Sequence, residues 1–158
     1  MYFVYTGKRQ KRMKGMFTFE LELPCQYSSI DTFDTKAAEA LKSYTDSYRS
    51  LVFIIHELVI NSLEASIKKF GSEAARYSIK LIISHADEGL EISVQDFAGG
   101  MDLQELEQLG NRTLGESVIS ESGRGLMMIQ QMVDEFKMNY EQDGLFTVKV
   151  RKEGVNYR

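Results

Sequence analysis

Cysteine is almost absent from this sequence, and its scarcity excludes several kinds of site. Cys25 is the only cysteine in the chain, so no disulfide can form within it, which is compatible with a reducing compartment. Zinc sites built on cysteine are excluded as well, and the two histidines, His56 and His85, make a poor metal centre by themselves. We therefore expect neither a disulfide-stabilised fold nor a cysteine zinc site.

Long apolar runs are also missing. The longest, Leu51 to Ile55, is far shorter than the roughly 20 residues that span a bilayer. The apolar residues 1–6 precede a basic run, which is the reverse of the order in a secretory signal. We expect a cytoplasmic protein that makes no membrane contact.

Positive charge is not in excess: the net charge is -4 and the pI is about 5.3, so nothing indicates direct nucleic-acid binding. Residues 1–15 nevertheless contain five basic residues, which we interpret as a solvated arm, with contact to an acidic partner or membrane surface as the alternative. The remaining residues, 16–158, are expected to form one domain. The whole chain is 43% hydrophobic and 27% charged, as is usual for globular proteins.

Hydrophobic periodicity predicts an α+β fold. Strands are expected at residues 16–23, 77–84, 90–96, 137–141 and 145–151, and the only proline, Pro24, ends the first of them. Helices are expected at residues 35–44, from Thr45 or Asp46 to Phe70, at 102–110 and at 125–136, with Gly71 as a stop signal. Hairpins imply antiparallel pairing, so we predict a two-layer sandwich with a mixed, mostly antiparallel sheet and helices on one face.

The predicted long helix carries two polar residues among apolar ones. Glu57 and Asn61 are four residues apart and therefore lie on one helix face, one turn from each other. A helix that is apolar around most of its circumference is usually buried, and polar groups there need partners, or they cost several kcal/mol. From this pair alone, a ligand site and a solvated stripe remain equally open, whereas Glu64 and Lys68 fit a surface ion pair.

An acidic residue ends the predicted strand 90–96. Its even-numbered positions are apolar until Asp96, so the two-residue period places Asp96 on the core face. A buried carboxylate must meet hydrogen-bond donors. Those donors are either the backbone of the following turn or a ligand such as the exocyclic amine of adenine. Gly99 and Gly100 would let a flat ligand approach closely.

A glycine turn, Gly123-Arg124-Gly125, is predicted directly before the last helix. A helix N-terminus favours phosphate through its free N–H groups and partial positive charge, and Arg124 could add charge-assisted hydrogen bonds. Such turns are common in plain loops, so this one gains weight only in combination with the other two motifs.

The three motifs together resemble the N, G1 and G2 boxes of the GHKL ATPases, a superfamily with gyrase, the heat-shock chaperone, histidine kinases and the MutL repair protein. The segments are HELVINSLEA (56–65), DFAGGM (96–101) and SGRGLMMI (122–129), and the resemblance covers about residues 16–152. Within the superfamily the chain is most similar to the bacterial anti-sigma factor serine kinases, through its short length, GRGLMMIQQMVDEF (123–136) and FTVKVRK (146–152).

The resemblance implies roles for individual residues. Glu57 matches a glutamate that acts as general base, Asn61 matches an asparagine that holds Mg²⁺ against the phosphates, and Asp96 matches the adenine-binding aspartate. Residues 102–122 match the ATP lid. The remaining nucleotide-binding positions it implies are Gly100, Met101, Gly123, Arg124, Gly125 and Leu126.

Three positions depart from the family pattern. Ala98 replaces the first glycine of D-x-G-x-G, which we expect to narrow the adenine pocket. Phe146 stands where the last strand usually presents a core-facing threonine, and Thr147 points away. Ala65 replaces a histidine that the serine kinases often carry four residues after the asparagine.

The function that the resemblance implies is an ATP- and Mg²⁺-dependent serine kinase. It would phosphorylate a serine of an antagonist protein, restrain a sigma factor and so regulate transcription, and the resemblance suggests a homodimer. Two alternatives remain: an ATP-dependent binding switch without phosphate transfer, and a detached histidine-kinase catalytic domain. The chain has neither a G-x-x-x-x-G-K motif nor the H-R-D and V-A-I-K motifs, which excludes P-loop proteins and eukaryotic-type kinases.

Overall fold

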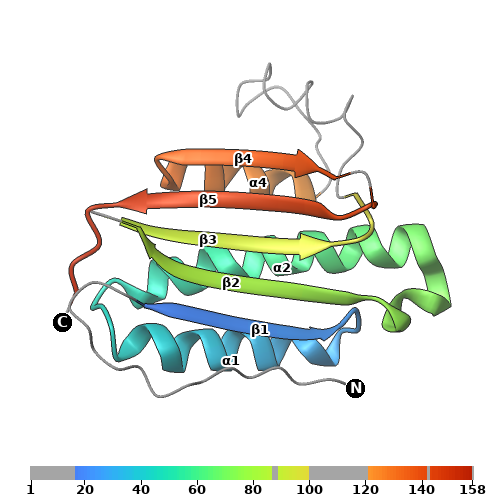
Figure 1. The fold of residues 1–158 in the computed structure, drawn as a ribbon, viewed down its shortest axis with the longest axis horizontal. Helices are drawn as coiled ribbons and strands as arrows, with labels where there is room; N and C mark the ends of the chain where they lie inside the picture. Colours follow the sequence, from blue (N-terminus) through green and yellow to red (C-terminus); the bar gives the residue numbers. More distant parts are fainter. Residues whose placement is uncertain (1–16, 87–88, 100–120, 142, 158) are drawn as a thin grey trace.

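The fold is an open sheet whose one face is covered by helices (Figure 1). The computed structural model describes residues 17–86, 89–99, 121–141 and 143–157. Buried side chains from the helices and from the inner face of the sheet pack together into one hydrophobic core. The predicted α+β class, with helices on one face, is confirmed.

The sheet has five strands in the order β1-β2-β3-β5-β4. They are β1 (Thr18–Pro24), β2 (Ser78–Ala86), β3 (Gly89–Asp96), β4 (Glu135–Tyr140) and β5 (Phe146–Glu153). Each predicted strand is present, with bounds shifted by at most two residues. Every pair of neighbouring strands is antiparallel, so no parallel pair occurs among the described strands.

The helices are α1 (Ser28–Lys42), α2 (Tyr48–Phe70), the 3-10 helix η1 (Gly71–Arg76) and α4 (Glu121–Met132). The predicted start of α1 was too late, because Phe33 and Ser29 also belong to its buried face. Thr45 and Asp46 do not cap α2: Ser47 is the N-cap position, and Thr45 is fully buried with its hydroxyl oxygen accepting a hydrogen bond from Ser47 N at 3.1 Å.

The end of α2 agrees with the prediction, since Gly71 adopts a φ of 59° there, a conformation that costs glycine little. The helix predicted at residues 102–110 lies outside the described residues, as does the arm predicted at 1–15.

Helix α2 lies in the centre of the helical layer. Its buried residues are Leu51, Ile54, Ile55, Leu58, Val59, Ser62, Leu63 and Ser66. By length and composition alone, the stretch Tyr48–Arg76 is the one described helix that could cross a membrane. Because the core helix of a globular domain passes the same test, the packing of α2 against the sheet accounts for its apolar character.

An aromatic cluster closes the end of the sheet where the described chain begins and ends. Phe17 and Tyr44 have ring centroids 4.3 Å apart, and Tyr157 lies 4.4 Å from His85. The Tyr157 hydroxyl donates a hydrogen bond to Gly89 O at 2.6 Å. Burial, and secondarily the nearby Tyr44, raises the pKa of Tyr157 to about 12.

We expect the free energy of unfolding to fall between about pH 10 and pH 12 through Tyr157. The raised pKa means that the folded state retains this proton over a range in which the unfolded state has lost it. Tyr157→Phe should lower stability at neutral pH by about 1 kcal/mol through the lost hydrogen bond and should flatten the alkaline slope. Urea unfolding from pH 8 to pH 12 measures both the stability at neutral pH and its alkaline slope. Tyr27→Phe serves as the control, because Tyr27 is 67% exposed. If the free energy of unfolding falls equally steeply with pH in wild type, Tyr157→Phe and Tyr27→Phe, Tyr157 is not the group responsible.

Candidate functional site

Helix α2 carries the two predicted site residues Glu57 and Asn61. The amide nitrogen of Asn61 is buried and has no hydrogen-bond partner among the described residues. A buried donor without a partner costs free energy, so the position fits a ligand that brings an acceptor, such as a phosphate oxygen. Glu57 is one turn earlier on the same face and is only partly buried.

Glu57 meets α4 at Gly125. A β-carbon placed on Gly125 would collide with Oε2 of Glu57, so the Glu57 carboxylate lies directly against this position of α4. The contact brings together two of the predicted site residues that are 68 residues apart in the sequence.

Asp96 is the most deeply buried acidic group of the site, with 2% of its surface exposed. Its Oδ1 accepts hydrogen bonds from Ala98 N (2.8 Å) and Gly99 N (3.2 Å), and its Oδ2 accepts one from the Ser62 hydroxyl. Burial raises the pKa of Asp96, and these three hydrogen bonds and the charge of Lys69 oppose that rise. The carboxylate thus makes the predicted turn contacts and still has acceptor capacity for a ligand donor.

Ser62 was missed by the sequence interpretation. It follows Asn61 directly, lies on the face of α2 that meets the sheet, and joins α2 to the end of β3. The available signal was a small polar residue at a position where the helical period requires burial. Ser66, one turn later, is also buried and donates to Ser62 O at 2.8 Å.

The glycine segment does not form a turn before a helix. Helix α4 begins at Glu121, four residues before the predicted start, so Gly123 and Arg124 lie within its first turn. The backbone N–H groups of a first helical turn have no intrahelical partner, and they can therefore still bind an anion. Leu126 is buried in the core rather than lining a surface. Gly100 and Met101 lie outside the described residues.

No group of three or more histidine, cysteine, aspartate or glutamate residues in the described ranges could hold a metal ion. Mg²⁺ is usually held by one or two protein ligands together with water and substrate phosphates. Asn61 could supply one such ligand through its side-chain carbonyl oxygen, since carbonyl oxygens suit Mg²⁺.

The contact between Glu57 and Gly125 leads to a stability prediction. Glycine to alanine within a helix normally stabilises by roughly 1 kcal/mol, but Gly125→Ala should gain less than this because the Glu57 carboxylate must move away from the new methyl group. In a Glu57→Ala background the full gain should reappear. Urea unfolding of the four proteins measures this coupling, and an identical effect of Gly125→Ala in both backgrounds would refute the contact.

A family model described as histidine kinase-like ATPase domain matches residues 23–152, a range that contains Glu57, Asn61, Asp96 and the whole of α4. A search of the curated proteins finds no match to the chain.

Proposed function

The chain belongs to the histidine kinase-like ATPase domain family, and on this premise we propose that it is a protein kinase that transfers phosphate from Mg·ATP to a serine of a partner protein. ATP binding follows from the family. The observation that supports the site is the link between α2 and β3, where the Ser62 hydroxyl donates a hydrogen bond to buried Asp96. Asn61, the residue before Ser62, has a buried amide nitrogen without a partner among the described residues.

Asp96 would accept a hydrogen bond from the exocyclic amine of adenine, since it is a buried acceptor with unused capacity. The first turn of α4, with Gly123 and Arg124, would bind phosphate through its N–H groups, and Gly125 would follow directly after it. Asn61 would hold Mg²⁺, which when bound would neutralise charge on the phosphates.

Glu57 would act as general base. The serine oxygen would attack the γ-phosphorus, the bond to the β–γ bridging oxygen would break, and the serine proton would pass to the Glu57 carboxylate. Its location beside Gly125 supports this role, because α4 brings the carboxylate next to the proposed phosphate-binding turn.

The partners are part of the proposal. The likeness of residues 123–136 and 146–152 to anti-sigma factor serine kinases supports a serine-bearing antagonist protein as substrate and a sigma factor as the restrained partner, with action as a homodimer in the cytoplasm. The G1 and lid positions, including Gly100 and Met101, would complete the nucleotide site.

The test is transfer of label from γ-labelled Mg·ATP to a panel of antagonist-type proteins that carry the acceptor serine. Acid-stable label on serine would support the proposal. Acid-labile label would instead identify a histidine-kinase catalytic domain. ATP binding without any transfer would leave a binding switch, and absence of ATP binding would overturn the nucleotide site itself.

A further inference from the structure

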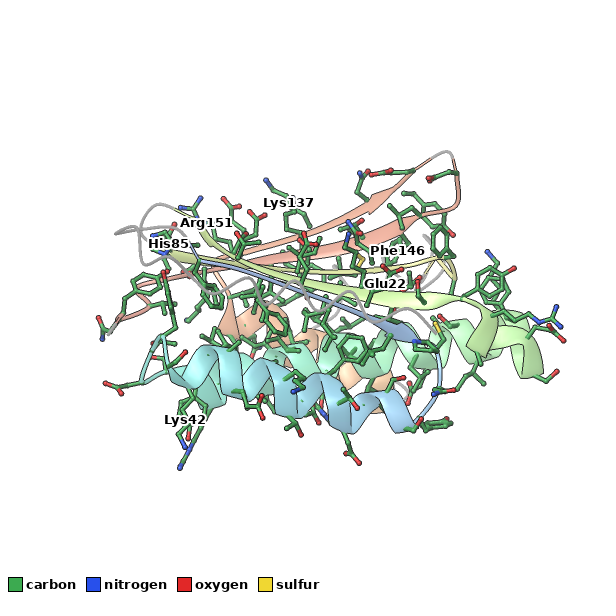
Figure 2. The ribbon with its side chains drawn as sticks, turned by 60° about the horizontal axis from the view of Figure 1, so that its bottom comes forward. Glu22, Lys42, His85, Lys137, Phe146 and Arg151 are labelled. Carbon is green, nitrogen blue, oxygen red and sulfur yellow. The ribbon has the colours of Figure 1, made fainter. Side chains whose placement is uncertain are left out.

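Three side chains form a row across the end of the sheet that carries Asp96. Asp96 is paired with Phe146 on β5, and Phe146 is paired with Tyr140 on β4. Residues paired in this way point to the same face of a sheet, so all three lie on the face that the helices cover. Figure 2 places Phe146 at this end, with His85 and Arg151 at the opposite one.

Tyr140 differs from the other inward-facing residues of β4. Phe136 and Met138 lie on the same face of β4 as Tyr140 and pack against the core. Tyr140, by contrast, has 49% of its surface exposed. Phe146, its neighbour in the row, is only 3% exposed. A large aromatic side chain thus points to the helical side of the sheet without being covered there by the core.

The ring of Tyr140 is held in place by two contacts. Its centroid lies 5.4 Å from that of Phe146 at an interplanar angle of 58°. Its hydroxyl occupies the space that a β-carbon of Gly99 would need. Gly99 has a φ of 80° and its N–H bonds to Asp96, so the same turn fixes both Asp96 and Tyr140.

We infer that Tyr140 is a further nucleotide-binding residue, whose ring contacts the purine base that Asp96 holds by its amine. The inference rests on the proposed function. Two strand spacings separate Asp96 from Tyr140, about 10 Å in all, and the Tyr140 hydroxyl lies against Gly99, whose N–H is bonded to Asp96. Aromatic rings bind bases by stacking, which tolerates a range of geometries.

The experiment uses the whole chain and two probes, Mg·ATP and inorganic tripolyphosphate, the second measured by competition against ATP. Tyr140→Ala should weaken ATP binding at least about fivefold, which is the lower end of what loss of one base–aromatic contact causes. Tripolyphosphate, which has no base, should bind within about twofold of wild type. Tyr140→Phe keeps the ring and should restore ATP binding, and Tyr27→Ala serves as an exposed-tyrosine control.

The outcomes separate this inference from the proposed function. If wild type binds ATP and Tyr140→Ala binds it equally well, the base contact is wrong and the nucleotide site stands. If Tyr140→Ala weakens the binding of Mg·ATP and of tripolyphosphate to the same extent, the stacking role is also wrong. The same holds if Tyr140→Phe fails to restore ATP binding. If wild type binds no ATP, the proposed function fails and this inference falls with it.

Discussion

Replacing Glu57 by glutamine is expected to lower the rate of phosphate transfer about a hundredfold or more, while the Kd for Mg·ATP stays within about threefold. General base catalysis contributes typically 10² to 10⁴ in rate, and an amide cannot accept the serine proton. Glutamine has nearly the same shape, so the close approach of Gly125 should be preserved. Single-turnover transfer with the partner protein measures the rate, and calorimetric titration measures the affinity.

The matched control for this substitution is Glu64→Gln, which removes a carboxylate from an exposed position two turns further along α2. It should leave both transfer and ATP binding unchanged. If Glu57→Gln instead loses ATP affinity to the same extent as transfer, Glu57 takes part in ground-state binding and is not specifically the base.

Strand positions could be predicted well because the alternation of apolar and polar residues identifies both the strand and its buried face. In β3 the prediction that Asp96 faces the core followed directly from the apolar residues at every second position before it, and its 2% exposure agrees. Helix ends were predicted less well. The start of α1 was missed because residues 28–34 are mostly polar. The helix begins at Ser28 because Phe33 is buried against the rest of the fold, a tertiary contact that local propensity does not reveal.

The contacts that assemble the site were the least predictable part. The four-residue spacing in one helix identified Glu57 and Asn61, but nothing local in the sequence indicates that Ser62 bonds to a residue 34 positions away or that Gly125 meets Glu57. A serine has no strong preference that distinguishes a buried linking role from an ordinary surface one. Such contacts depend on how α2, α4 and β3 pack together, which periodicity does not determine.

Asp96→Asn should abolish the stabilisation of the protein by Mg·ATP. In wild type, ligand at 100 times its Kd adds about 2.7 kcal/mol, which raises the unfolding midpoint by several degrees in a domain of this size. Asparagine keeps an oxygen for the N–H groups of Ala98 and Gly99 but replaces the carboxylate with a neutral group, whose nitrogen cannot accept from the adenine amine. Thermal unfolding with and without Mg·ATP measures the loss, and a shift equal to that of wild type would show that Asp96 is not the contact.

The same substitution should leave the ligand-free protein as stable as wild type, or more so, at neutral pH. Because burial raises the pKa of Asp96 above its unfolded value, the folded state holds that proton more tightly, and ionisation at neutral pH disfavours the fold. Removing the charge removes this cost, provided that the Ser62 hydroxyl turns to accept from the new amide. The advantage of Asp96→Asn should shrink as pH falls through the raised pKa, where the wild-type carboxyl is neutral too. Unfolding midpoints from pH 7 down to pH 3 test this, and a variant that is uniformly less stable would mean that the hydrogen bonds of the ionised carboxylate outweigh its burial.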